Sequence, residues 1–413
     1  MFFSELEKIV KTGLLRIIKD REPYLKPFYN YQNDKNVYQP EFEPYGSSHI
    51  LISGTEYINF SSNDYLGLSS HRMVMASAKT AIDKYGVGSG ASRLLSGGTD
   101  LNIKLEQMIA QFKGTESALV FNSGYTANTS AIPAIASEGD VIFSDELNHA
   151  SIVDGCRLSR AKKMIYRHGD VEHLSLLLKK EKGQKRVVIT DSVFSMDGDI
   201  APLEEIFNVC RENGAILYID DAHGTGVLGE GRGALNHFGI KPEPWIIQMG
   251  TLSKALGSFG AFIAASRETI QWLINRARGL IFSTALPACT IAASIKAIEI
   301  LKEETVLLKS LWENRQKLFE GIRELGYDTL NSQTPIIPLI TPMIQGKDVV
   351  ESTNIFSKIL MENRIYAPAI RPPTVKIPRI RFTAIAPHTE QDIETLLSCL
   401  KDIKNQSGSA NNR

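Results

Sequence analysis

The sequence predicts an α/β fold, with a large domain around a mostly parallel sheet and a smaller α+β domain at its C-terminal end. The chain has 413 residues, more than a single domain usually needs. From residue 140 onward, short apolar runs alternate with segments of helical period, which is typical of parallel strands covered by helices. After residue 283 the pattern changes to long helices separated by short strands.

Six apolar runs in the middle of the chain are predicted strands. Several are apolar on both faces, as expected of strands buried in a parallel sheet. A shorter run, ALVF at 118–121, has the same strand-like character. The six runs are DVIFSD (140–145), KKMIYRH (162–168), RVVITDSVF (186–194), AILYIDDAH (215–223), WIIQMG (245–250) and GAFIAAS (260–266).

Helices are predicted where apolar residues recur at helical spacing between a start and a stop signal. In APLEEIFNVCRENG, Pro202 marks the start and Gly214 the end. MVMASAKTAIDKYG and DLNIKLEQMIAQFKG end in the same way, at Gly86 and Gly114. The C-terminal part is predicted to contain two long helices, the strand IIPLIT, a third helix, the strand IPRIRFTA and a last helix.

Pattern alone divides the chain into four parts. These are an N-terminal segment (1–60), a large domain (61–285), a small domain (286–405) and a disordered tail (406–413). The first residues are amphipathic and lack the apolar core of a signal peptide. No apolar run is long enough for a membrane span.

Charge and cysteine content exclude several classes of protein. Forty-six basic residues balance 46 acidic ones, so no overall field would attract nucleic acid or an anionic membrane. An anionic ligand must therefore be bound by local groups. The four cysteines are far apart and form no CxxC pair, which predicts reduced, buried thiols in a cytoplasmic protein and no metal site.

Lys254 is the first candidate for chemistry. It follows an apolar strand in QMGTLSKALGSFGA, close to Thr251 and Ser253. A buried lysine loses its proton more readily and can then form a Schiff base, and nearby hydroxyls and flexible backbone suit a phosphate. A lysine in a loop of small residues can also be a solvated surface residue, so this motif needs its context.

Acidic and imidazole groups supply that context. Asp220 ends the strand AILYID on its inward face, where a buried carboxylate can keep a pyridine nitrogen protonated. His223 follows shortly after. Asp221 could equally cap a helix or form an ion pair. His149, after another strand, could lie over a flat cofactor and exchange protons near neutral pH, or could be structural.

Two further turns are candidates for cofactor contacts. FNSGYTANTS follows ALVF and opens a helix, so Gly124 and Tyr125 lie where free N–H groups and the helix dipole favour a phosphate. Ser195, in DSVFSMDGD, ends a strand and could equally be a turn residue. GVGSGASRLLSGG follows a helix, not a strand, so it predicts an active-site or subunit-contact loop and not a dinucleotide site.

The ordered motifs of the chain resemble those of the α-oxoamine synthases, pyridoxal-phosphate enzymes with the aspartate-aminotransferase fold, also called fold type I. The likeness covers residues 59–389. It implies a pyridoxal 5'-phosphate cofactor and a homodimer. The motifs are NDYLGL, GSGASR, NSGYTAN, NHASIVDG, SVFSMDGD, DDAHGTGV, TLSKALG, FSTALP, and IRPPTV with RIRFT.

The resemblance implies a role for each matching residue. Lys254 would hold the cofactor as a Schiff base, and Asp220 would pair with its pyridine nitrogen. Asn63 and Arg381 would bind substrate, with the Arg381 guanidinium holding the carboxylate of the amino acid in a bidentate pair. Arg379 points to the same face as Arg381. The other implied contacts are His149 stacked on the ring, His223 and Ser195 near the ring hydroxyl, Gly124, Tyr125 and Thr251 at the phosphate, and Ser283 and Thr284 at the phosphate of the neighbouring subunit.

The reaction that the resemblance implies is acyl transfer: an amino acid joins an acyl thioester of coenzyme A or acyl carrier protein, carbon dioxide leaves, and an α-amino ketone results. IRPPTV at 370–375 is most similar to members that use L-alanine and a pimeloyl thioester in biotin synthesis. Asn102 stands where the family has a histidine. The aromatic stretch 24–46 is similar to serine palmitoyltransferase and leaves a serine-using or long-chain acyl relative open. A glycine acyltransferase, an aminotransferase of the same fold and a non-catalytic partner subunit are further alternatives.

Overall fold

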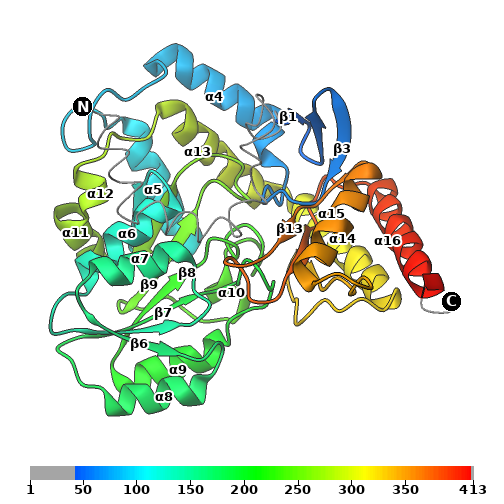
Figure 1. Cartoon of the computed structure of the whole chain (residues 1–413). Helices are drawn as coiled ribbons and strands as arrows, with labels where there is room; N and C mark the ends of the chain where they lie inside the picture. The colour runs from blue at the N-terminus through cyan, green and yellow to red at the C-terminus, as the bar shows by residue number, and fades with distance from the viewer. Residues whose placement is uncertain (1–41, 411–413) are drawn as a thin grey trace, which may run out of the picture.

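The structure is a computed structural model that describes residues 42–410 (Figure 1). The predicted N-terminal amphipathic segment and most of the aromatic stretch 24–46 lie outside the described residues. Among residues 42–410, no helix has the length and apolar character needed to cross a membrane.

A seven-stranded sheet forms the centre of the molecule, in the order β4-β10-β9-β8-β7-β5-β6. Strands β5 to β9 pair in parallel, and β10 runs antiparallel to both β9 and β4. The mostly parallel sheet is therefore confirmed, and all seven predicted strands belong to it. They are β4 (Ser117–Phe121), β5 (Val141–Asp145), β6 (Lys162–Tyr166), β7 (Arg186–Asp191), β8 (Ile216–Asp220), β9 (Ile246–Thr251) and β10 (Ala261–Ala265).

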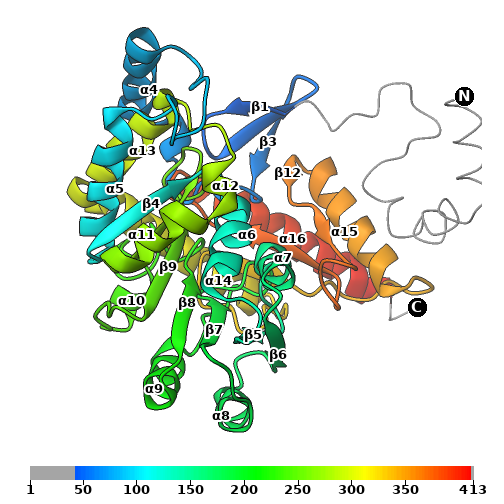
Figure 2. The same cartoon turned by 90° about the vertical axis from the view of Figure 1, so that its left-hand side faces the viewer.

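Helices bury both faces of this sheet, and the two sets can be followed in Figure 2. Phe143 of β5 packs into one hydrophobic cluster and its neighbour Ile142 into the other. This alternation explains why the strands are apolar at successive positions. One face is covered by α6 (Gly124–Ile135), α7 (Ala150–Leu158), α11 (Arg267–Arg276) and α12 (Arg278–Ile281), the other by α5 (Asp100–Lys113), α8 (Val171–Lys180), α9 (Leu203–Asn213) and α13 (Ala288–Glu303).

The helix ends follow the predicted signals. Helix α9 begins after Pro202 and ends at Gly214, whose φ of 60° is the left-handed conformation that glycine adopts without strain. Helix α4 (Arg72–Tyr85) packs against α13. At the start of α5, Asn102 is a helix-capping residue, because its side chain accepts a hydrogen bond from the backbone N–H of Thr99.

The C-terminal part has its own core, which the long helices α14, α15 and α16 surround at one end of the molecule in Figure 1. Its predicted strands and helices are confirmed. Its strands form a three-stranded C-terminal sheet in the order β11-β14-β13. A four-stranded sheet, β1-β2-β3-β12, contains the first described strands, and there β12 pairs in parallel with β3. The elements are α14 (Thr305–Glu324), β11 (Ile336–Leu339), α15 (Val349–Glu362), β13 (Ala369–Ile370), β14 (Arg379–Thr383) and α16 (Glu390–Ala410), with β1 (Phe42–Tyr45), β2 (His49–Ile52), β3 (Thr55–Asn59), η1 (Leu68–Ser70) and β12 (Ile365–Tyr366).

The predicted domain boundaries stay predictions. The apolar side chains of α13 belong to the core of the central sheet, although α13 follows residue 285. Phe60 belongs to the core of the C-terminal part. Helix α16 continues to Ala410, beyond residue 405.

A buried ion pair ties α5 to the end of β8. The Lys113 ammonium lies 2.7 Å from a carboxylate oxygen of Asp221, and the two side chains are 0% and 2% exposed. Lys113 also donates to the carbonyl of Arg232, and the hydroxyls of Ser192 and Thr225 donate to Asp221. Of the alternatives open for Asp221, the ion pair is confirmed.

We expect Lys113→Ala to lower the free energy of unfolding by about 3–5 kcal/mol, because the change leaves the Asp221 carboxylate buried without its counter-charge. Urea unfolding followed by circular dichroism measures this. Lys104→Ala is the matched control, since Lys104 is 57% exposed and lies 3.9 Å from Glu299. It should change stability little. Equal effects of the two substitutions would show that the buried pair is unimportant.

Candidate functional site

The carboxyl ends of the parallel strands meet at one edge of the sheet, the usual place for a ligand in this architecture. Asp191 ends β7 and lies beside Asp220, which ends β8. Thr251 ends β9. A cavity of about 180 Å³ opens at this edge. Eight predicted site residues line it: Gly124, Tyr125, His149, Ser195, Asp220, His223, Thr251 and Lys254.

Lys254 projects its amine toward His223, with 2.8 Å between Nζ and Nε2. Burial lowers the pKa of Lys254 to about 8, although the carboxylates of Asp220 and Asp191 favour the ammonium form. The charge of Arg381 adds to the lowering. A useful fraction of the side chain is therefore a free amine near neutral pH, as a nucleophile or a base requires.

Asp220 is buried at the base of the cavity. Its Oδ2 accepts a hydrogen bond from Asn128 at 2.7 Å, and its Oδ1 accepts one from the backbone N–H of Ala222 at 3.0 Å. Burial raises the pKa of Asp220, while these hydrogen bonds and the Lys254 charge oppose the rise. A cation placed beside this carboxylate would be stabilised strongly.

Sequence reasoning missed Asn128, which Tyr218 also holds through a hydrogen bond from its hydroxyl at 2.8 Å. Asn128 lies one helical turn beyond Gly124 on α6 and is fully buried. A signal was present, because the helical period places position 128 on the same face of α6 as position 124.

His149 caps the N-terminus of α7. Its Nδ1 is 2.7 Å from the hydroxyl of Ser151, and its backbone N–H donates to Asp191 at 2.7 Å. Burial lowers the pKa of the imidazole. Asp191 was also missed, because the predicted strand RVVITDSVF continued to residue 194, whereas β7 ends at Asp191.

His223 is held from the other side by Tyr65, whose hydroxyl is 2.7 Å from Nδ1. Burial lowers the pKa of His223 well below its usual value, and neighbouring cations lower it further. Tyr65 lies in the segment that touches the loop after Lys254. A Cβ at Gly257 would lie 2.2 Å from the backbone nitrogen of Ser69, so only glycine permits this contact.

Arg381 joins the C-terminal sheet to the cavity. Its guanidinium donates to the carbonyl of Ser195 at 2.5 Å and to the side-chain oxygen of Asn63 at 3.0 Å. Arg379, predicted to face the same side, instead pairs with Asp197. The structure thus separates the two arginines and brings Arg381 and Asn63 together.

Polar groups suited to an anion also line the cavity. The hydroxyls of Thr251 and Ser253 are 2.6 Å apart, and Gly124 and Tyr125 form the first turn of α6. The Tyr125 side chain is half exposed and donates to Asp154.

Ser283 and Thr284 do not line the cavity that contains Lys254. They line a small hollow with Asn122 and Arg93, where the Asn122 side chain donates to the carbonyl of Thr284 at 2.8 Å. Within one chain, the structure keeps this pair apart from the other predicted cofactor contacts.

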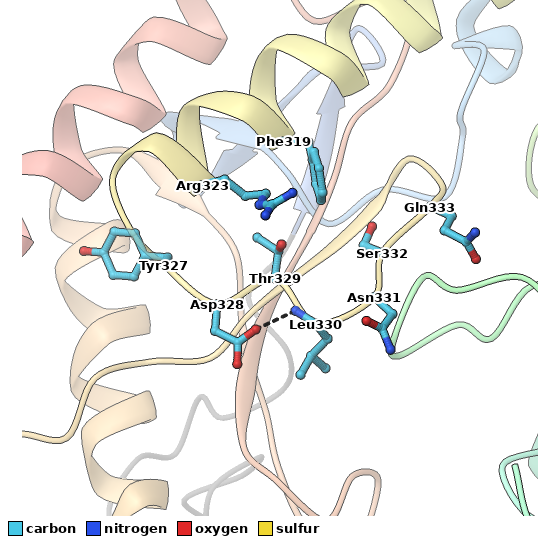
Figure 3. Close-up of a pocket in the computed structure, with 9 residues that line it drawn as sticks. All are labelled: Phe319, Arg323, Tyr327, Asp328, Thr329, Leu330, Asn331, Ser332 and Gln333. Carbon is cyan, nitrogen blue, oxygen red and sulfur yellow. Dashed lines mark hydrogen bonds between the residues drawn. The ribbon is translucent and has the colours of Figure 1, made fainter.

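A wider hollow of about 640 Å³ lies in the C-terminal part, between α14 and the loop 328–333 (Figure 3). Phe319 and Arg323 project into it from α14, and Asp328 accepts a hydrogen bond from the backbone N–H of Leu330. No predicted site residue lines it. Its charged lining residues are Arg323 and Asp328. The cavity at the strand ends has more titratable side chains with shifted pKa values, including Asp220, His223 and Lys254, so it is the better candidate for chemistry.

His168 holds the loop that contains Ser195. Its Nδ1 lies 3.0 Å from Asp145 and its Nε2 lies 2.8 Å from Asp199. The His168 ring therefore bridges the end of β5 and the turn after Ser195. Burial disfavours the charged ring, but the hydrogen bonds with both carboxylates outweigh burial and raise the pKa of His168 to about 10. No pattern in the sequence predicted this bridge.

The comparisons with known proteins agree with the predicted fold and family. Residues 55–400 match the family described as aminotransferase class I and II. A protein of Thermodesulfovibrio yellowstonii is 52% identical over 402 residues, which covers 97% of this chain and 96% of that protein. The 8-amino-7-oxononanoate synthase of Geotalea daltonii is 47% identical over 369 residues, with 88% and 92% covered.

Solved structures give the same result. A serine palmitoyltransferase from S. paucimobilis with bound PLP and myriocin has a TM-score of 0.86 at 28% identity, covering 95% of this chain and 98% of that chain. The 8-amino-7-oxononanoate synthase from Francisella tularensis has a TM-score of 0.72 at 29% identity, covering 85% and 98%. The predicted fold type I and the resemblance to the α-oxoamine synthases are confirmed.

We expect His168→Gln to destabilise the protein in a pH-dependent way. The pKa of His168 in the folded chain, about 10, is above the value of about 6.5 in an unfolded chain. The charged ring therefore contributes fully below pH 6.5, and its contribution is lost as the pH rises through 10. Urea unfolding at pH 6, 8 and 10 measures the difference between the variant and the wild type.

His237→Gln, at an exposed position at the end of α10 (Ala234–His237), is the control. Its effect should be small at each pH. A His168→Gln deficit that stays constant from pH 6 to 10 would contradict the charge assignment.

Proposed function

This chain belongs to the aminotransferase class I and II family, and we propose that it uses pyridoxal 5'-phosphate to join L-alanine to a pimeloyl thioester, as 8-amino-7-oxononanoate synthases do. The relatives that carry this name are 41–47% identical over 84–92% of the chain. The single observation that carries the proposal is the cavity in which the Lys254 amine and the buried Asp220 carboxylate occur together.

The residues present fit this cofactor. The buried Asp220 carboxylate has its orientation fixed by Asn128 and the N–H of Ala222, and it suits a protonated pyridine nitrogen. The first turn of α6 and the hydroxyl of Thr251 suit a phosphate. When bound, the cofactor accepts the electron pair left on the α-carbon of the amino acid after its proton is removed.

The side chains of this protein would carry out the other steps of the reaction. Lys254 would take the α-proton on Nζ, since burial makes its amine available near neutral pH. Arg381 would hold the substrate carboxylate until it leaves as carbon dioxide, and Asn63 keeps that guanidinium oriented. His149, whose pKa burial lowers, would stack on the ring as a neutral imidazole.

Serine palmitoyltransferase-like chemistry is the second candidate, because structures with that name have a TM-score of 0.86. The 47% identity with the 8-amino-7-oxononanoate synthase of Geotalea daltonii exceeds the 28–29% identity with these serine palmitoyltransferases, which favours alanine. Glycine remains the third possible amino acid. Lys254 and Asp220 are both present, which argues against a non-catalytic partner subunit.

We further propose a cytoplasmic homodimer with shared sites. Ser283 and Thr284 lie outside the cavity of their own chain, where a neighbouring cofactor could meet them. The side chains of Val87, Leu95 and Phe282 are 74%, 81% and 69% exposed. Such exposed apolar groups in the loop predicted to contact a subunit, and beside Ser283, support an interface there.

Product analysis tests the reaction. We expect carbon dioxide and 8-amino-7-oxononanoate from L-alanine with pimeloyl-coenzyme A or the pimeloyl carrier protein, and lower rates with serine or glycine and with palmitoyl or acetyl thioesters. Mass spectrometry of the products and trapping of released carbon dioxide measure this. Amino transfer to a keto acid without release of carbon dioxide would point to an aminotransferase.

In the same assay, Lys254→Ala should lower turnover by about 10²–10⁴-fold or more, because it removes the proposed base and covalent anchor. Circular dichroism should show an intact fold. Full activity of this variant would refute the assigned role of Lys254.

Subunit mixing tests the shared site. Lys254→Ala should be inactive, and so should a chain altered at both Ser283 and Thr284 to alanine. A heterodimer of the two should regain activity, because one of its two sites is then fully intact. If subunit exchange is verified by mass and no activity returns, the shared-site model is wrong.

A further inference from the structure

We propose that Tyr65 is a positioning residue that fixes the tautomer of His223 and thereby holds Lys254 as the free amine. This inference rests on the proposed function, in which Lys254 must react as an amine. Tyr65 comes from NDYLGL, the motif that also contains Asn63.

The three side chains form a chain of short contacts that leads from Tyr65 to His223 and Lys254, which line the cavity. The Tyr65 hydroxyl lies 2.7 Å from His223 Nδ1, and His223 Nε2 lies 2.8 Å from Lys254 Nζ. Tyr65 is 1% exposed and His223 is 7% exposed. The charge of the nearby Arg381 guanidinium also acts on the Tyr65 hydroxyl.

The donors and acceptors in this chain determine where the protons lie. Burial raises the pKa of Tyr65 to about 12, so its hydroxyl keeps its proton. A guanidinium can only donate, so Arg381 cannot accept that proton. Of the described groups that contact the hydroxyl, Nδ1 of His223 is the one that can accept. Tyr65 therefore donates to Nδ1.

The second proton position follows from the charge of His223. Burial, together with the charges of Lys254 and Arg381, lowers the pKa of His223 well below its usual value, so the imidazole is neutral. A neutral imidazole carries one proton, and Nδ1 is already an acceptor. The proton is therefore on Nε2, which donates to Nζ of Lys254. An ammonium cannot accept a hydrogen bond, so this contact favours the amine.

The other charged groups around Lys254 act in both directions. Asp220 from β8 and Asp191 from β7 favour the ammonium form. Burial and Arg381 from β14 favour the amine. His149, from the start of α7, is less readily protonated because of Lys254. The Tyr65–His223 pair adds a hydrogen bond that exists only with the uncharged lysine.

Loss of the Tyr65 hydroxyl should reverse the arrangement. In Tyr65→Phe, Nδ1 has no hydroxyl donor, so the imidazole can carry its proton there and accept from the Lys254 ammonium through Nε2. The apparent pKa of Lys254 should then rise by about one unit, which makes the amine about tenfold scarcer at pH 7.

The first experiment measures how fast the full chain, stripped of cofactor, captures pyridoxal 5'-phosphate between pH 6 and 10, by absorbance. The wild-type rate should rise with a midpoint near pH 8. The midpoint of Tyr65→Phe should be about one unit higher, with about tenfold slower capture at pH 7. Tyr327→Phe is the matched control, since it also removes a buried hydroxyl, one that donates to the carbonyl of Leu400 in the C-terminal core.

Coincident midpoints for Tyr65→Phe and the wild type would overturn the inference. The capture assay contains no amino acid or thioester, so it is independent of the condensation reaction. Failure of the wild type to capture the cofactor would instead refute the proposed function.

A second experiment needs no substitution. Nitrogen-15 NMR of histidine-labelled wild-type protein distinguishes a protonated from an unprotonated ring nitrogen. We expect His223, assigned by its disappearance in His223→Gln, to have a protonated Nε2 and an unprotonated Nδ1. A protonated Nδ1 would overturn the inference even if Tyr65→Phe fails to fold.

Discussion

The central sheet is buried on both faces, and this burial determines where polar side chains can lie. It requires apolar side chains at successive positions of each inner strand, so polar groups are placed where the strands end. The parallel register then sets those ends side by side, and Asp191 and Asp220 become neighbours. The low exposure that stabilises the sheet also shifts the pKa values of Lys254 and Asp220, and the reactive properties of the cavity follow from it.

The loop between β7 and α9 connects the central sheet with the C-terminal part. His168 fixes it at Asp199, and Arg381 binds the carbonyl of Ser195. The backbone N–H of Gln333 and the hydroxyl of Thr334 both donate to the carbonyl of Gly198. One short loop thus connects the large sheet with the arginine proposed to bind substrate, so the position of that arginine depends on contacts from both sides.

Much of the fold and half of the site chemistry could be predicted from the sequence, because both depend on local signals. Apolar runs identified the strands, and Lys254 and Asp220 follow such runs directly. Lys113 and Tyr65 gave no such signal, and for Asn128 the helical period indicated only that it faces the same side of α6 as Gly124. Each acts through a partner far along the chain, at Asp221, His223 and Asp220 respectively, and no local period or spacing encodes those contacts. The resemblance identified motifs, but the hydrogen bonds between motifs required the folded chain.

The pairing of β12 with β3 has a consequence for how the protein is made. Ile365 lies beside Ile58, and Phe60 packs in the C-terminal core, so that core uses residues from both ends of the chain. During synthesis the first of these residues leave the ribosome well before their partners exist, with the whole central sheet translated in between. Strands β1 to β3 are synthesised before their neighbour β12, and the C-terminal core can form completely only after β12 and α16 have been made. A chain that ends just before α16 would therefore contain Arg381 and a central sheet that can form, but would lack the helix that completes the C-terminal core around β14.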